Sequence, residues 1–342
     1  MKAYPIKFEP ILKEKIWGGT KLKEVLNKKT TCDRVGESWE ISAVKGSISK
    51  VKNGEYIGFT IVDLLKMFKK SFLGRDNYER FGNEFPLLIK FLDANRNLSV
   101  QVHPDDKMAR KKHNSFGKTE MWYIMGHDKD AKIIVGLKNH VKKKSDLAKV
   151  CKKNVYDILN SYKVAKGDAY FIPAGQVHAI GAGVLAAEIQ QTSDITYRLY
   201  DWDRKNEQGV GRELHIDNAI RATKKKTASS RIVDRSSFNT TTEVVNSNFF
   251  TTNSFRVYGS YKKDYTHRDS FIILLCTEGL ATISVNGITE VVEKGETVLL
   301  PASTENAYLF SKTAQFLEVF ISEPVNRESS SACGKKHLAV AS

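Results

Sequence analysis

The sequence has few cysteines, and no two of them lie close together in a motif such as Cys-x-x-Cys. Its four cysteines, Cys32, Cys151, Cys276 and Cys333, are scattered along 342 residues. This distribution argues against both a disulfide framework and a cysteine-ligated metal, and it predicts reduced thiols in a cytoplasmic protein.

Long apolar segments are also missing. The longest purely apolar run, residues 271–276, is far too short to cross a membrane. Residues 1–17 contain no long apolar run, so no signal peptide is expected. The sequence therefore predicts no association with a membrane.

Basic residues are abundant but not concentrated. The net charge is +15, yet the lysine clusters are short and scattered, at 111–112, 142–144 and 224–226. No RNA-binding aromatic signature, zinc finger or recognition-helix pattern accompanies them. Solvated helix faces and loops account for these lysines, so no nucleic-acid partner is predicted. A positive field would also attract a phosphorylated substrate.

Length and composition favour about two globular domains. With 41% hydrophobic and 10% aromatic residues, the chain can form a sizeable core. Strand-like segments predominate, and helices lie between them. Thr60 is expected to cap a helix that runs to about Lys70, and Ser145 to cap another whose apolar stripe reaches Leu159. Trp-Gly-Gly at 17–19 predicts a turn before a short helix over 21–27.

Residues 98–106 contain the first pair of metal-capable side chains. Read as a strand, this segment places Val100 and Val102 on one face and Gln101 and His103 on the other. Pro104 ends the strand directly after them. The two polar side chains are therefore expected to point to the same side of a sheet.

Two later segments supply further ligands. Residues 117–124 predict a strand with Glu120, Trp122 and Ile124 on one face, and residues 171–178 end in a histidine just after a Pro-Ala-Gly turn. Taken singly, such residues are more often ion-paired or solvated. Together they form a set of two oxygen and two nitrogen donors that suits zinc or another borderline divalent ion: Gln101, His103, Glu120 and His178.

The second half contains an internal repeat. Residues 166–174 recur as residues 294–302, each with a Gly-acid turn, a short apolar strand and Pro-Ala. The offset is 128 at both ends, since 295 − 167 and 301 − 173 agree. In this register His178 corresponds to Asn306. Residues 271–276 and 281–285 are expected to form a hairpin, with a type I′ turn at Asn286-Gly287. The repeat predicts two related β-barrels, with metal chemistry only in the first.

Four motifs carry a family resemblance: Gln-Val-His-Pro-Asp-Asp at 101–106, Gly-Lys-Thr-Glu at 117–120, Phe-Ile-Pro-Ala-Gly-Gln-Val-His at 171–178 and Ser-Asp-Ile-Thr-Tyr-Arg at 193–198. The chain resembles the cupin superfamily and, more closely, the type I phosphomannose isomerases in their short bacterial form. The resemblance implies a mainly β fold of two cupin-type jelly-roll β-barrels with helical insertions. Residues 1–240 would form the catalytic barrel and residues 241–322 a degenerate barrel without metal ligands. The tail, 323–342, matches nothing in the family and is expected to be disordered.

The resemblance also implies an activity, the interconversion of mannose 6-phosphate and fructose 6-phosphate through an enediolate. It implies one zinc ion per chain, bound by the four residues already identified, and it assigns active-site roles to Asp194, Arg198 and Lys118. Arg198 would stabilise the enediolate or bind the phosphate. The proton carrier stays open among Asp194, Lys118, a metal-bound water and a metal ligand.

Two further residues, Trp17 and Glu40, could line the substrate pocket. Alternatively, Trp17 could belong to the packed core and Glu40 to a surface ion pair. Arg198 could instead form an ion pair with Asp194, if that segment is helical.

Two alternative functions are open for the whole chain. One is a non-catalytic cupin that binds a sugar or sugar phosphate, and the other is an iron-dependent cupin oxygenase. The protein is expected to be a monomer or a homodimer.

Overall fold

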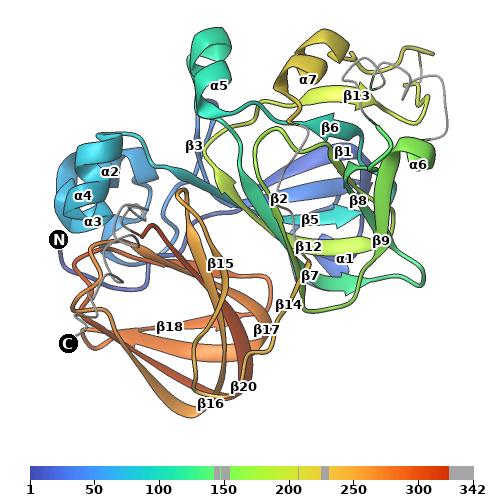
Figure 1. The fold of residues 1–342 in the computed structure, drawn as a ribbon. Helices are drawn as coiled ribbons and strands as arrows, with labels where there is room; N and C mark the ends of the chain where they lie inside the picture. The colour runs from blue at the N-terminus through green and yellow to red at the C-terminus, as the bar shows by residue number, and fades with distance from the viewer. Residues whose placement is uncertain (142–146, 148–154, 207, 225–230, 323–342) are drawn as a thin grey trace, which may run out of the picture.

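The computed structural model describes residues 1–141, 147, 155–206, 208–224 and 231–322. The predicted fold class is confirmed, because sheets dominate two jelly-roll-like parts of the chain and helices are inserted between strands (Figure 1). The predicted tail, 323–342, lies outside the described residues. None of the helices in the described ranges is long and apolar enough to span a membrane.

Two antiparallel sheets form the first part. One has seven strands, in the order β1 (Ile11–Gly19), β2 (Val35–Ile41), β5 (Leu87–Ala94), β12 (Val184–Gln191), β7 (Glu120–His127), β10 (Asp168–Ile172) and β14 (Arg231–Val233). The other has five, in the order β13 (Tyr197–Tyr200), β6 (Val100–Val102), β11 (His178–Ile180), β8 (Lys132–Leu137) and β9 (Leu159–Lys163).

Strand β7 shows how the period of two builds this part. Trp122 and Ile124 pack in a core with residues of the five-stranded sheet, such as Ile133. Met121 and Tyr123 point to the opposite face and pack in a different core. The predicted alternation along this strand is therefore confirmed, and it separates an inner face from an outer one.

Helices and short elements fill the connections: α1 (Lys21–Glu24), β3 (Ala43–Val44), β4 (Ser47–Ile48), η1 (Gly54–Tyr56), α2 (Ile61–Phe68), α3 (Lys70–Leu73), α4 (Arg75–Phe81), α5 (Asp106–His113), α6 (Val155–Ile158) and α7 (Ile216–Ala222). Thr60 caps α2 as predicted, because its hydroxyl accepts from the Asp63 amide and the Asp63 carboxylate accepts from the Thr60 amide. The helix ends at Phe68, since Lys69 has a φ of 45° and the chain turns there into α3.

Two local predictions were wrong or fall partly outside the described residues. Residues 17–19 are not a turn but the end of β1, where Gly18 allows close approach to β2: a Cβ there would lie 2.5 Å from the Arg34 carbonyl oxygen. Most of the helix predicted from Ser145 lies outside the described residues. Its predicted end is also wrong, because Leu159 begins strand β9.

The second part is a six-stranded sheet of long, curved strands, in the order β15 (Thr242–Asn246), β16 (Thr251–Asp264), β20 (Asn306–Phe320), β17 (Ile272–Val285) and β18 (Ile288–Glu293), with β19 (Thr297–Leu300) pairing with β17. The two runs predicted as a hairpin are one strand, β17. The type I′ turn is confirmed, because Asn286 and Gly287 both have positive φ, 50° and 78°, between β17 and β18.

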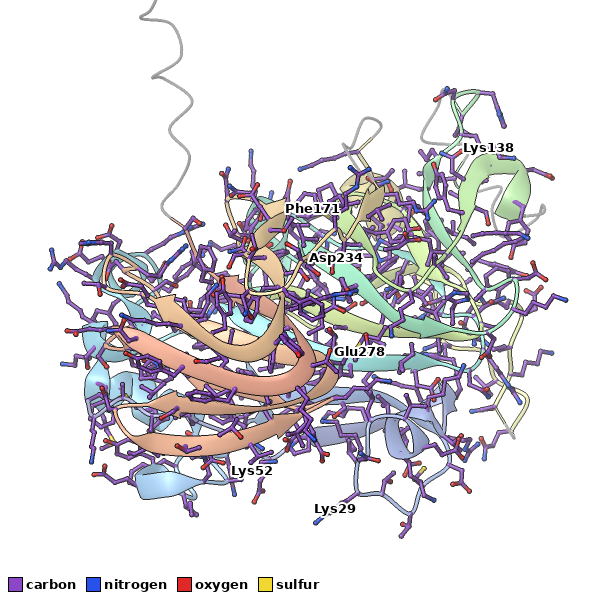
Figure 2. The ribbon with its side chains drawn as sticks, turned by 90° about the horizontal axis from the view of Figure 1, so that it is seen from below. Lys29, Lys52, Lys138, Phe171, Asp234 and Glu278 are labelled. Atoms are coloured by element: carbon purple, nitrogen blue, oxygen red, sulfur yellow. The ribbon has the colours of Figure 1, made fainter. Side chains whose placement is uncertain are left out.

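The outer face of the seven-stranded sheet packs against the second part. One hydrophobic cluster contains residues from both, including Tyr123, Leu185, Leu275 and Leu317. The Gln315 side chain donates to the Tyr123 hydroxyl at 2.8 Å, and this hydroxyl donates to Asp234 at 2.8 Å. Figure 2 shows Asp234, Phe171 and Glu278 along this junction.

Candidate metal centre

Gln101 lies in β6, and His103 directly follows the last residue of this strand. The strand is short because Pro104 follows, and its register places Gln101 opposite His178 of β11. The His103 Nδ1 atom lies 3.0 Å from the Ile195 carbonyl oxygen. A carbonyl can only accept, so the proton resides on Nδ1, and the Nε2 lone pair faces the interior.

His178 is held in the same way. Its Nδ1 atom lies 2.8 Å from the Gln176 carbonyl oxygen, which again leaves Nε2 as the free donor atom. The Gln101 amide lies 3.3 Å from this Nε2 atom. Backbone carbonyls therefore fix both imidazoles in the tautomer that a metal needs.

Glu120, the first residue of β7, lies between the two imidazoles. Its Oε1 is 3.3 Å from His178 Nε2, and its Oε2 is 3.4 Å from His103 Nε2. The three donor atoms lie within 4.8 Å of one another. A tetrahedral zinc ion with ligand bonds of about 2.1 Å separates its ligand atoms by about 3.4 Å. The structure thus brings together the four residues predicted as ligands.

The protonation states of these side chains also suit a cation. Burial lowers the pKa of His103 to about 3, with Lys118 acting in the same direction, and burial lowers the pKa of His178. Burial acts to raise the pKa of Glu120, but the nearby Lys118 and imidazoles hold this pKa well below its usual value. The site therefore presents neutral imidazoles and an ionised carboxylate.

One observation tests the fit of a metal directly. Both carboxylate oxygens of Glu120 are buried, and neither accepts a hydrogen bond from the described residues. Lys118 approaches as an ion pair, with Nζ 3.0 Å from Glu120 Oε2 and 3.1 Å from His103 Nε2. The ion pair with Lys118 compensates part of the carboxylate charge, but both buried oxygens still lack a hydrogen bond, and a divalent cation would satisfy them. The donor set fits zinc.

A cavity of about 230 Å³ opens beside this cluster. Of the residues predicted for the site, Gln101, Lys118, Asp194, Arg198 and Trp17 line it. Basic side chains outnumber acidic ones in its wall: Lys15, Lys90, Lys118, Arg198 and Arg212 against Glu37, Glu188 and Asp194. The excess of positive charge favours an anionic ligand.

Glu40 lies outside the cavity wall. Its carboxylate forms an ion pair with Lys28 at 2.7 Å and accepts from the Ser38 hydroxyl. Both ends of this ion pair are buried, so it belongs to the interior and not to the surface. Glu37, three positions earlier in β2, lines the cavity instead.

Arg198 lies on β13, not on a helix, and it forms no ion pair with Asp194 in the described structure. Its Nη1 donates to the Glu213 carbonyl at 2.8 Å, while its buried Nε makes no hydrogen bond with the described residues. Burial and the neighbouring Arg212 lower the pKa of Arg198. The guanidinium therefore keeps donors for a ligand.

Sequence reasoning missed a buried ion pair in the cavity wall. Lys90 of β5 and Glu188 of β12 are register partners, with Nζ 2.9 Å from Oε2, and the Trp122 indole donates to Glu188 at 3.0 Å. The sequence did contain a sign of this pair, because Lys90 and Glu188 are each a charged residue within an otherwise mostly apolar strand. Such residues are rarely buried without a partner.

Comparisons with known proteins agree with this picture. The family described as phosphomannose isomerase type I, catalytic domain, matches residues 6–147, and the mannose-6-phosphate isomerase cupin domain matches residues 239–320. Mannose-6-phosphate isomerase ManA of Bacillus subtilis is 36% identical over 88% of this chain and 94% of its own length. Mannose-6-phosphate isomerase of Streptococcus mutans is also 36% identical, over 87% of this chain and 93% of its own length. A solved Bacillus subtilis mannose 6-phosphate isomerase superposes with a TM-score of 0.81 at 31% identity, covering 92% of this chain and 99% of that one.

Proposed function

The chain belongs to the type I phosphomannose isomerases and is an aldose–ketose isomerase, and on this premise we propose how its site interconverts mannose 6-phosphate and fructose 6-phosphate. The proposal includes one zinc ion per chain, held by Gln101, His103, Glu120 and His178. The observation that carries it is the buried Glu120 carboxylate, which lies between two imidazoles and lacks hydrogen bonds from the described residues. Zinc bound there would act as a Lewis acid on a substrate oxygen.

The cationic cavity selects the substrate class. The phosphate group of a hexose phosphate is doubly negative, and the basic side chains of the cavity wall attract it. Arg212 is held rigidly by Asp201, with Nε 2.7 Å from Oδ2, so it is a preorganised phosphate contact. Arg198 lies opposite Gln101 in the β13–β6 register, beside a metal ligand. We assign to Arg198 the stabilisation of the negative oxygens of the enediolate.

The isomerisation moves one proton between C2 and C1 of the sugar. The base must be a carboxylate or another acceptor within reach of the substrate. Of the three acidic residues in the cavity wall, Glu37 and Glu188 form ion pairs with Lys15 and Lys90. Asp194 forms no ion pair or hydrogen bond with another described side chain, so we assign the proton transfer to it. Lys118, next to Glu120 in the cluster, donates to a substrate oxygen.

A coupled assay tests this function. Purified protein is expected to form fructose 6-phosphate from mannose 6-phosphate, to lose activity in a chelator and to regain it when zinc is restored. Metal analysis is expected to find about one zinc per chain. Binding of a sugar phosphate without turnover would instead support the non-catalytic cupin, and iron with oxygen consumption would support the oxygenase. A cytoplasmic location, a monomeric or dimeric state and the domain division at residue 240 stay predictions.

A further inference from the structure

A second cavity has a volume of about 180 Å³. It shares no lining residue with the first cavity. Its wall draws on both parts of the chain: Arg80, Phe81, Pro86, Asp106, Arg110, Phe116, Gln191 and Phe249. The proposed isomerisation uses none of these residues.

The wall combines aromatic rings with guanidinium groups. Phe81 and Phe116 meet edge to face, with ring centroids 6.2 Å apart, and Phe249 adds a third ring from the second part. Arg80 donates to the Asn248 carbonyl from both Nη atoms. Arg110 is exposed, and its guanidinium forms no ion pair or hydrogen bond with the described residues. Two cations and three rings recognise a ligand that has a negative group and a flat apolar body.

The acidic residue in the wall, Asp106, already accepts hydrogen bonds from neighbouring residues of the chain. Asp106 Oδ1 accepts from the Gly117 amide at 2.8 Å and from the Gln191 side chain at 3.0 Å. Its negative charge therefore serves internal donors, and the two guanidinium groups leave the wall with a net positive charge. A cavity of about 150 Å³ holds benzene in an engineered protein, so the volume suits a ligand with a single ring.

The same two side chains hold the backbone beside the metal ligands. The Asp106 carboxylate accepts from the Gly117 amide, and the Gln191 side-chain oxygen accepts from the Thr119 amide at 2.9 Å. The Gln191 backbone amide also donates to the Thr119 carbonyl at 3.1 Å. Lys118 lies between these anchored residues, and Glu120 follows them. A ligand that contacts Asp106 and Gln191 therefore acts on the segment that positions a metal ligand.

We propose that this cavity is a second binding site, for a small aromatic anion, and that its occupation alters turnover at the first site through residues 117–120. The binding part of the proposal stands without the proposed isomerase function. Only the effect on turnover rests on that function.

Phenyl phosphate is the probe, and calorimetry on the full chain measures its binding while mannose 6-phosphate is saturating. We expect binding to persist under this saturation. Arg110→Gln is expected to weaken it about tenfold, since a charge-assisted hydrogen bond is lost. Phe116→Ala removes a ring contact and is expected to weaken it as well. Lys111→Gln, the same loss of charge at the next, exposed position of α5, is the matched control and is expected to bind as wild type.

Three outcomes would overturn the proposed binding site, and the response of kcat tests the coupling separately. Loss of binding under saturating mannose 6-phosphate would place phenyl phosphate in the first cavity. Equal affinity for inorganic phosphate would remove the aromatic contact, and equal affinity for phenol would remove the anionic one. A change in kcat with phenyl phosphate is expected in wild type and not in Arg110→Gln. If binding persists but kcat is unchanged, the coupling is refuted while the site and the isomerase function both stand.

Discussion

Ile272 occupies in the second part of the chain the place that Glu120 occupies in the first. Glu120 begins β7 and pairs with Ile172 of β10, and Ile272 begins β17 and pairs with Leu300 of β19. The partners Ile172 and Leu300 are 128 residues apart, the offset of the internal repeat. An isoleucine has no ligand atom, so the second part keeps the strand pairing of the first while this ligand position is apolar.

The repeat provides a matched test of the metal site. His178→Ala is expected to reduce bound zinc and kcat by about a hundredfold or more. Loss of a side chain that only hydrogen-bonds to a metal ligand already lowers metal affinity or activity by about 10- to 100-fold. Asn306→Ala changes the corresponding position of the second part and is expected to keep both. Metal analysis and the coupled assay measure the two variants, and circular dichroism checks their fold. Wild-type zinc content in His178→Ala would contradict the ligand assignment.

The sequence predicted the metal cluster better than the cavity around it. Gln101, His103 and Glu120 follow from the period of two along single strands, which is a local property. Lys90 and Glu188 were missed because their pairing depends on the register between β5 and β12, which are almost a hundred residues apart. A strand pattern shows that a residue faces a sheet surface, but it does not show which distant strand lies beside it.

Glu40 and Glu37 illustrate the same limit. Successive side chains of a strand point to opposite faces, so two residues three apart in β2 face different sides. The structure shows that Glu37 faces the cavity and Glu40 faces Lys28. The sequence contains the alternation, but the side that bears the cavity depends on the arrangement of whole sheets.

Arg198 provides a test of the catalytic assignment. Arg198→Ala is expected to lower kcat by about a hundredfold or more, because a preorganised donor to a developing oxyanion is lost. The zinc content should not change, since Arg198 is not a ligand. Arg235→Ala removes an exposed arginine outside the cavity and is the control. If Arg198→Ala raises KM and leaves kcat unchanged, Arg198 binds the phosphate and does not act in the chemical step.

The backbone before Glu120 is packed too tightly for a larger residue. A Cβ on Gly117 would lie 2.6 Å from the Asp106 amide nitrogen, so Gly117→Ala must displace the chain that carries Lys118 and Glu120. We expect lower zinc affinity and lower kcat. Gly126→Ala, in strand β7 itself, meets only Leu185 side-chain atoms at 3.9 Å and is expected to be tolerated. Titration of the metal-free variants with zinc compares the two, and equal affinities would show that segment 117–120 does not position the ligand.

A buried ion pair in the second part should affect stability and leave catalysis unchanged. Lys263 Nζ lies 2.8 Å from Glu318 Oε1, and the Lys263 and Glu318 side chains are only 9% and 2% exposed. Tyr265 donates to the same carboxylate at 2.7 Å, and Asn253 donates at 2.9 Å. Lys263→Met leaves Glu318 without its cation, so the free energy of unfolding is expected to fall by about 3 kcal/mol. Lys262→Met, at the exposed neighbouring position, should change it by about 0.5 kcal/mol or less.

The stability difference between wild type and Lys263→Met should depend on pH in one direction. Burial acts to raise the pKa of Glu318, but Lys263, Asn253 and Tyr265 hold this pKa below its ordinary value of 4.5. A carboxylate whose pKa is lowered by folding contributes stability above the pKa of the unfolded chain, and this contribution is lost as the pH falls through the lower, folded value. The unfolded chains share the same Glu318 pKa, so the difference in unfolding free energy should be largest near neutral pH and shrink as the pH falls toward the lowered pKa of Glu318 in folded wild type. Denaturant titrations at pH 7, 5 and 4 measure it, and a difference that grows toward low pH would show that Glu318 is not the ionised partner of Lys263.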